Sequence, residues 1–130
     1  MSDYVADTHA LYWYLMASPK LGAKARQAFG EAAQGLALIF LPAIVLAELF
    51  YVNKKHGEPL DFAAAFLRLQ QSSQFVLLPF EPTDVLDFSA HATVPEMHDR
   101  LVVGAALRLG VPCLTHDGQI VNSGLVNTVW

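Results

Sequence analysis

The sequence predicts a single α/β domain with a mostly parallel sheet of about five strands and helices on both faces. Short apolar segments alternate with helical segments along the whole chain, which is the order produced when crossover helices join parallel strands. Residues 36–41 read Leu-Ala-Leu-Ile-Phe-Leu without polar alternation, which is typical of a strand covered on both faces. A chain of 130 residues fits one domain, expected to span residues 1–130.

Turn and helix-stop residues divide the chain into these elements. Ser18-Pro19 interrupts the first helix, Pro42 fits the first turn of a later one, and Gly110 ends the last long helix. The predicted strands are 3–7, 36–41, 75–80, 111–115 and 125–129, and the predicted helices are 8–17, 21–33, 43–56, 60–71, 82–92 and 98–109, with a short turn after Asp117.

Composition indicates a cytoplasmic protein with one extra buried face. Apolar residues make up 54% of the chain and charged residues 15%, which predicts an oligomer or partner interface, such as that of a homodimer or a larger hetero-oligomer. Pro42 and Glu48 interrupt the longest apolar stretch, and the N-terminus lacks a signal-peptide pattern, so no membrane association is expected. The single cysteine, Cys113, fits a reducing compartment.

Four acidic residues have neighbours that are unusual for a solvated surface. Asp7 and Asp117 each follow an apolar strand, Asp99 lies in the first turn of a helix, and Glu48 lies within an apolar helix. Three of them have ordinary structural explanations, since Asp7 can cap a helix, Asp99 can favour a helix N-terminus, and Asp117 can be a turn residue. Glu48 is harder to explain, because no Lys or Arg lies three or four positions away from it.

These acids are expected to converge at one edge of the sheet. In a doubly wound sheet, Asp7 and Asp117 both lie at carboxyl ends of strands, and the helices that carry Glu48 and Asp99 can reach the same edge. Such a cluster repels itself and is tolerable only with a counter-charge, most simply a divalent cation. Oxygen ligands select hard cations, which predicts Mg²⁺ or Mn²⁺.

Four short segments, each containing one of these acids, carry a resemblance to a known family. They read Val-Ala-Asp-Thr-His-Ala-Leu at 5–11, Ala-Glu-Leu at 47–49, His-Asp-Arg-Leu-Val-Val-Gly-Ala-Ala at 98–106 and Leu-Thr-His-Asp at 114–117. In this order and spacing they resemble the PIN-domain nucleases, in particular the VapC-type toxins of bacterial toxin–antitoxin pairs, over essentially the whole chain. The resemblance implies an acid-edged parallel sheet, a Mg²⁺ or Mn²⁺ cofactor, RNA as the substrate and a cognate antitoxin as a partner.

The same resemblance assigns roles to the site residues. Asp7, Glu48, Asp99 and Asp117 become the catalytic metal-site acids, with Asp7 and Asp99 as direct ligands. Glu48 is expected to bind through water, and Asp117 to hold a second ion or orient waters. Metal-activated water would then hydrolyse RNA phosphodiesters to 5′-phosphate and 3′-hydroxyl ends. The chain departs from the family at residues 41–42, Leu-Pro, where members often have Ser or Thr.

Contacts with the RNA are assigned to Thr8, Arg100 and Thr115. Arg100 adjoins Asp99, and Thr115 matches a hydroxyl residue that lies beside the last acid in the family. The formal charge of −4 does not exclude RNA, because removing the four site acids from the 12 leaves 8, which equals the 8 Lys and Arg. RNA binding should therefore be modest and dependent on salt.

Several alternatives stay open at this point. A metal-dependent phosphatase commonly has a second acid two residues after the first, where this chain has His9. A Mg²⁺-binding regulatory or partner-binding module without nuclease activity is a second alternative. His9, His98 and His116 each lie close to a site acid, so a mixed histidine–carboxylate metal site is a third. The aromatic residues at 12–14 and 50–51 are expected in the core, with some forming a dimer face or an antitoxin groove rather than an RNA-stacking platform.

Overall fold

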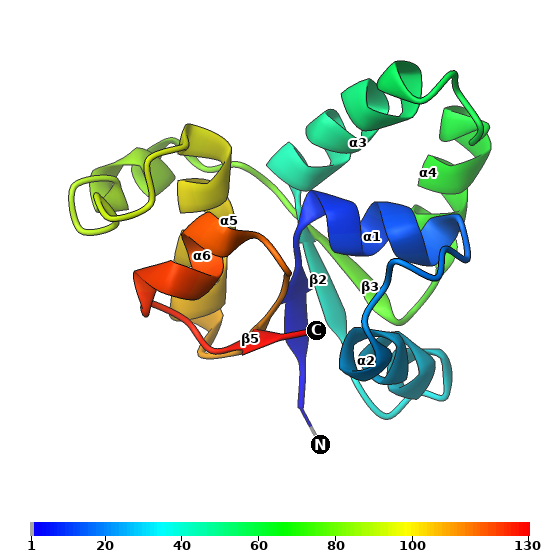
Figure 1. Ribbon diagram of the computed structural model, residues 1–130, viewed down its shortest axis with the longest axis horizontal. Helices are drawn as coiled ribbons and strands as arrows, with labels where there is room; N and C mark the ends of the chain where they lie inside the picture. The colour runs from blue at the N-terminus through cyan, green and yellow to red at the C-terminus, as the bar shows by residue number, and fades with distance from the viewer. Residues whose placement is uncertain (1) are drawn as a thin grey trace.

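The computed structural model describes residues 2–130, and their strands form one parallel sheet (Figure 1). The five strands are arranged in the order β3-β2-β1-β4-β5, and every neighbouring pair runs parallel. Their bounds are β1 (Tyr4–Ala6), β2 (Ile39–Pro42), β3 (Phe75–Leu78), β4 (Cys113–Leu114) and β5 (Thr128–Val129). The predicted α/β class and its parallel sheet are confirmed.

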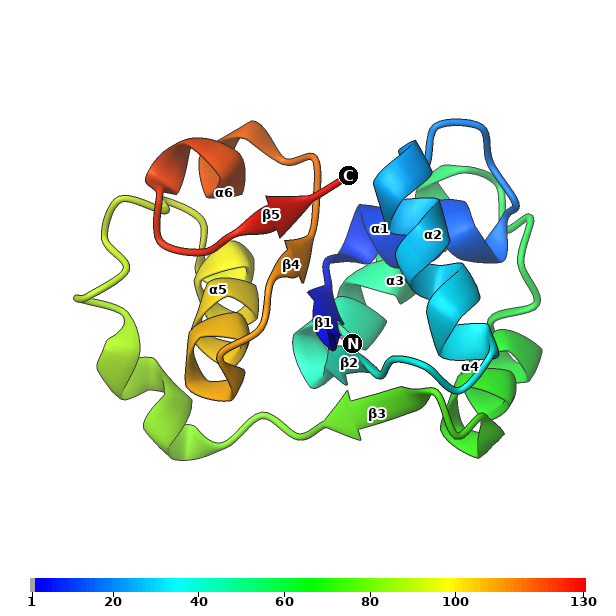
Figure 2. The same cartoon turned by 90° about the horizontal axis from the view of Figure 1, so that it is seen from below.

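Helices cover both faces of this sheet. Figure 2 shows α1 and α2 on one side of it and α5 and α6 on the other. The helices are α1 (Thr8–Leu15), α2 (Ala23–Ala33), α3 (Ala43–Lys55), α4 (Phe62–Gln71), the 3₁₀ helix η1 (Pro82–Asp87), α5 (Met97–Leu109) and α6 (Gly118–Ser123). Among residues 2–130, no helix combines the length and apolar character needed to cross a bilayer.

The central strand β1 determines where a site can form. Val5 and Ala6 are fully buried, because β1 has a strand on each side and helices on both faces. The chain leaves β1 towards α1 on one face and leaves β4 towards α6 on the other (Figure 2). Because the connections diverge, a crevice opens beyond the carboxyl ends of these two neighbouring strands. Asp7 lies at the end of β1, in the middle of the sheet, as expected.

Several predicted strands are shorter than expected, and one predicted helix is looser. The second strand begins at Ile39 rather than at residue 36, and Leu36 and Leu38 are exposed, so their apolar character does not reflect burial. The helix expected over 82–92 is the 3₁₀ helix η1 followed by turns. Val85 and Leu86 of η1 are exposed, so this segment lacks the buried apolar face that stabilises a regular helix.

The segment after Asp117 is more ordered than predicted. Instead of a turn, it forms α6, whose first residue is Gly118 and whose Ile120 is fully buried. Glycine is a poor helix former, which concealed this helix in the sequence. The last strand, β5, contains only Thr128 and Val129 of the expected 125–129. Cys113 is a buried free thiol.

Candidate active site

Asp7 is held rigidly between β1, β4 and α1. Its backbone N–H donates to the Leu114 carbonyl of β4 (3.1 Å), and its Oδ1 accepts from the N–H of Ala10 (2.9 Å), which makes it the N-cap of α1. Its Oδ2 accepts a hydrogen bond from the Thr115 hydroxyl. Burial raises the pKa of Asp7, although both hydrogen bonds act in the opposite direction. Each carboxylate oxygen keeps a further lone pair with which it can bind a cation.

Thr115 and Asp117 form the adjacent wall, where β4 ends. The Thr115 side chain is buried, and its hydroxyl both donates to Asp7 and accepts from the backbone N–H of Asp117 (3.0 Å). The Asp117 Oδ1 accepts from the backbone N–H groups of Gln119 and Ile120, so this acid caps α6. Thr115 therefore connects the acid after β1 to the acid after β4.

Glu48 reaches the site from the second turn of α3. Its Oε1 accepts a hydrogen bond from the Thr8 hydroxyl (2.9 Å), and its Oε2 lies 3.4 Å from Nδ1 of His98. These partners come from α1 and α5, so they are distant in the sequence. The sequence correctly indicated that Glu48 has no Lys or Arg partner within its own helix, but its carboxylate has partners from two other helices.

Asp99 lies in the first turn of α5, and the negative charges of the other acids affect its pKa. Its pKa is raised to about 7, first by burial and then by the negative charges of Asp117, Glu96, Glu48 and Asp7. A carboxyl group surrounded by this much negative charge is stabilised in its ionised form by a cation.

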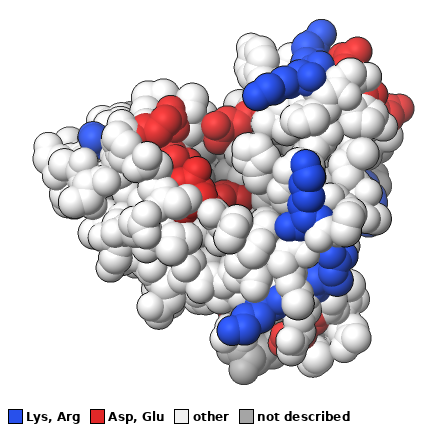
Figure 3. Space-filling view, viewed as in Figure 1, with Lys and Arg blue, Asp and Glu red and all other residues white. Residues whose placement is uncertain are grey.

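The four predicted acids line one pocket of about 210 Å³ at the crevice between β1 and β4. Figure 3 shows acidic side chains gathered in a central hollow, with Lys and Arg mostly over the half of the face built from α1–α4. The remaining lining residues are Thr8, His9, Val52, Glu96 and Val102. The predicted convergence of the acids is thus found in the structure.

Residues 4–122 match the family model of the PIN domain. The chain belongs to the PIN-domain family. No curated protein matches the sequence. The family assignment therefore depends on the domain model, whose match begins with β1, just before Asp7, and ends within α6, which Asp117 caps.

Solved structures share this PIN fold at low sequence identity. VapBC2 from Rickettsia felis, bound to a DNA fragment from its promoter, gives a TM-score of 0.69 at 16% identity, with 97% of this chain and 96% of that chain covered. FitAcB from Neisseria gonorrhoeae gives a TM-score of 0.66 at 18% identity, with coverage of 96% and 95%. At such identities the likeness concerns the fold.

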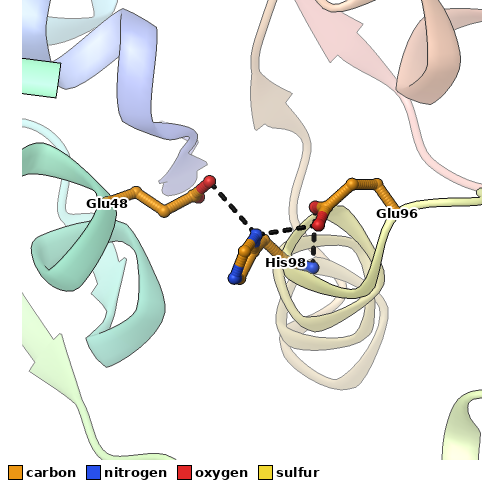
Figure 4. Close-up of side chains that lie close together, drawn as sticks. All are labelled: Glu48, Glu96 and His98. Carbon is orange, nitrogen blue, oxygen red and sulfur yellow. Dashed lines mark hydrogen bonds and ion pairs between the residues drawn. The ribbon is translucent and has the colours of Figure 1, made fainter. Parts of the chain in front are cut away.

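A fifth acid, Glu96, belongs to the pocket of this PIN domain and was not predicted. Its carboxylate caps α5 by accepting from the N–H groups of His98 (2.8 Å) and Asp99 (3.3 Å), and it contacts Nδ1 of His98 at 2.8 Å. Figure 4 shows His98 between Glu96 and Glu48. One ligand atom from each of these three side chains lies within 4.8 Å of the others. The signal available in the sequence was an acid at the N-cap position of the helix that carries Asp99.

The residues predicted to contact RNA have partners within the PIN domain. Arg100 donates from Nε to the Val94 carbonyl (2.6 Å) and from Nη1 to the Phe88 carbonyl (3.3 Å), so it ties the loop before α5 to that helix. The hydroxyls of Thr8 and Thr115 donate to Glu48 and Asp7, respectively. In this state, all three side chains support the site architecture.

Proposed function

We propose that this PIN domain is a metal-dependent endoribonuclease and the toxin component of a toxin–antitoxin pair. The observation that carries the proposal is the convergence of Asp7, Glu48, Asp99 and Asp117 in one pocket beside the sheet's central strand. Of residues 2–130, those that line this pocket include no Ser, Cys or Gly, so they provide neither a nucleophilic Ser or Cys nor a phosphate-binding glycine loop. Its chemistry suits a bound cation acting on a phosphodiester.

The donor set fits Mg²⁺ or Mn²⁺. Hard divalent cations prefer carboxylate oxygens, and a cation offsets the burial and the like charges that together raise the pKa of Asp99 to about 7. Asp7 and Asp99 would hold the ion directly, with Glu48 acting through water and Asp117 holding a second ion or orienting waters. When bound, the ion would lower the pKa of a water and stabilise negative charge on the phosphate.

The chain's own residues position these ligands. Thr115 and the N–H of Ala10 orient the two oxygens of Asp7, and Thr8 orients Glu48. Such supporting hydrogen bonds matter, because mutation of a residue that supports a metal ligand typically lowers metal affinity or activity about 10- to 100-fold. In-line attack by water with departure of the 3′ oxygen would yield 5′-phosphate and 3′-hydroxyl ends.

The toxin assignment has separate support. The similar structures from Rickettsia felis and Neisseria gonorrhoeae are described as VapBC2 and FitAcB, and the former is bound to promoter DNA. In this chain, Tyr51 of α3 and Leu67 of α4 are large apolar side chains that are 70% and 50% exposed. An antitoxin or a second copy of the chain would cover such residues. We therefore propose a cognate antitoxin and a homodimer or larger assembly.

Cleavage of single-stranded RNA in Mg²⁺ or Mn²⁺ tests the nuclease proposal. The wild type should cut in metal and stop in EDTA, and Asp7→Asn should reduce the rate at least about 100-fold, because it changes a direct ligand. Asp61→Asn is the matched control, since Asp61 caps α4 as Asp7 caps α1 but lies outside the pocket.

Two further outcomes separate the alternatives. Undiminished cutting by folded Asp7→Asn would contradict the site assignment. Hydrolysis of a phosphomonoester in place of RNA would favour the phosphatase, and metal binding with neither activity would favour the regulatory module. For the toxin role, induced expression of the wild type should arrest bacterial growth, whereas Asp7→Asn should not.

A further inference from the structure

A second, larger pocket lies against the acid pocket. Its volume is about 460 Å³, within the range of small-molecule sites. The two pockets share Asp7, His9 and Asp117 as lining residues, so they are continuous across the carboxyl ends of β1 and β4. The part beyond the acids is lined by His9, Trp13, Lys20, His116 and Trp130, and we name these five residues the aromatic pocket.

The walls of the aromatic pocket are rings from separate parts of the chain. On α1, His9 and Trp13 lie one turn apart, with their ring centroids separated by 5.7 Å. On the β4–β5 side, His116 stacks on Trp130 at 5.3 Å with an angle of 20° between the ring planes. Stacked and tilted rings of this kind offer flat apolar surfaces of the size of a nucleobase.

Close packing holds Trp130 in place. A side-chain carbon at Gly22 would lie 2.5 Å from Cδ1 of the Trp130 ring and 2.4 Å from its carbonyl carbon. Trp130 can therefore occupy this position only because residue 22 is glycine. The carbonyl of the preceding residue, Val129, accepts a hydrogen bond from the backbone N–H of Thr115 (3.2 Å). This wall is therefore bonded to Thr115, whose hydroxyl donates to Asp7.

Within residues 2–130, Lys20 is the only Lys or Arg that lines the larger pocket, which Asp7 and Asp117 also line, so a nucleotide phosphate there needs this ammonium together with a bound cation. The Lys20 Nζ lies over the Trp13 ring, 4.7 Å from its centroid. An ammonium at this position attracts a phosphate. Because the acid pocket lies next to it, a nucleotide here could place its base against an open ring face of Trp13 or Trp130 and its phosphate towards the cation site.

We propose that the aromatic pocket binds the base of an unpaired nucleotide adjoining the phosphodiester that is cut. The proposal rests on the nuclease function above and names its substrate form: single-stranded RNA with one base stacked against Trp13 and Trp130. Stacking explains the shape of the pocket without sequence-specific hydrogen bonds, because every base has a π-face. Double-stranded RNA, whose bases are already stacked, is expected to be a poor ligand.

Intrinsic fluorescence provides a direct test. The chain contains two tryptophans, and both line the aromatic pocket. Titration of the wild type with adenosine 5′-monophosphate in Mg²⁺ should quench their emission saturably, whereas ribose 5-phosphate, which lacks the base, should not. The probe has no phosphodiester bond, so nothing is cleaved during the measurement. Absence of quenching, or quenching by arginine amide in place of the nucleotide, would overturn the proposal.

Variants locate the effect by calorimetric titration with the same nucleotide. Trp13→Ala should weaken binding by about 5- to 150-fold, the range for loss of one base–aromatic stack. Trp13→Phe keeps a ring and should retain most of the affinity. Phe80→Ala is the control, since Phe80 is a 48% exposed aromatic residue that lines neither pocket. Equal affinity of wild type and folded Trp13→Ala would overturn the proposal, and the wild-type titration stays decisive if that variant does not fold.

The binding and cleavage results can fail separately. If the nucleotide binds in the aromatic pocket but RNA is never cut, the nuclease proposal is wrong and the base-binding assignment stands. If RNA is cut with equal KM and kcat by wild type and Trp13→Ala, the nuclease proposal stands and the aromatic pocket is not a base site.

Discussion

The two sides of the acid pocket are organised by different forces. Beside β1 and β4, hydrogen bonds hold Asp7 through Ala10 and Thr115, and Asp117 caps α6. Beside α5, no hydrogen bond to the Asp99 carboxylate is found within residues 2–130, and burial and like charges raise its pKa to about 7. Burial raises the pKa of Asp7 too, but its two hydrogen bonds favour the ionised carboxylate, whereas no such bond offsets burial and like charge at Asp99.

This difference indicates what a cation would contribute to each side. The strand side is ordered through its own hydrogen bonds, so it can accept an ion with little rearrangement. The α5 side becomes favourable in its ionised form only when positive charge is present. Removal of metal should thus act mainly on the α5 side, and the following predictions test that contrast.

The largest effect is expected for Asp99→Asn. Cleavage should fall at least about 100-fold, because a direct ligand is changed. The metal-free protein should at the same time gain thermal stability at pH 8, since the amide removes a half-buried charge beside four other carboxylates. Activity assays and thermal melts in EDTA measure the two effects, with Asp61→Asn as the control. Lower stability of the metal-free variant at pH 8 would contradict an electrostatically strained α5 side.

An intermediate effect is expected for Thr115→Val. This change removes the donor to Asp7 and the acceptor of the Asp117 N–H, so activity should fall about 10- to 100-fold. Stability should fall by about 1–3 kcal/mol, because buried polar groups lose their partner. Thr8→Val is the matched comparison, since Thr8 is also buried but donates only to the partly exposed Glu48. Steady-state kinetics and denaturant unfolding would compare the two variants. A larger loss of activity or stability for Thr8→Val would contradict the expectation that Thr115 contributes more to the site.

The smallest effect is a pH dependence of stability without metal. The folded-state pKa of Asp99 is about 7 and its unfolded value is 3.8, so between these values the folded protein holds more protons than the unfolded chain. Stability should therefore decrease as pH rises through this window, and the raised pKa of Asp7 acts in the same direction. We expect the melting temperature in EDTA to drop by on the order of 5 °C.

Two measurements complete this pH test. Adding Mg²⁺ at pH 8 should restore the lost stability, because the cation favours the ionised carboxylates. Asp99→Asn in EDTA should show a flatter profile than the wild type. A wild-type melting temperature that rises between pH 5 and pH 7 in EDTA would contradict the raised pKa.

The main features of the fold could be read from local patterns. The unbroken apolar character of residues 36–41 predicted a parallel strand, of which 39–41 lie in β2, and Asp7 at the end of the first strand predicted the position of the pocket. Local signals failed where tertiary contacts decide the conformation. The segment 82–92 contains residue types that favour a helix, but η1 within it has no buried residue. By contrast, α6 begins at a glycine and still forms, because Asp117 caps it and Ile120 is buried.

By itself, the sequence determined the α/β class, the mostly parallel sheet and the four acids, because strand periodicity and acids at strand ends are local properties. Only the tertiary structure decided the partners of those acids. Thr8 and His98 reach Glu48 from other helices, and Thr115 reaches Asp7 across 108 positions. The contribution of Glu96 and the meeting of Trp13 with Trp130 around one pocket have the same origin. Such contacts depend on how helices pack at the edge of the sheet, which no short stretch of sequence specifies.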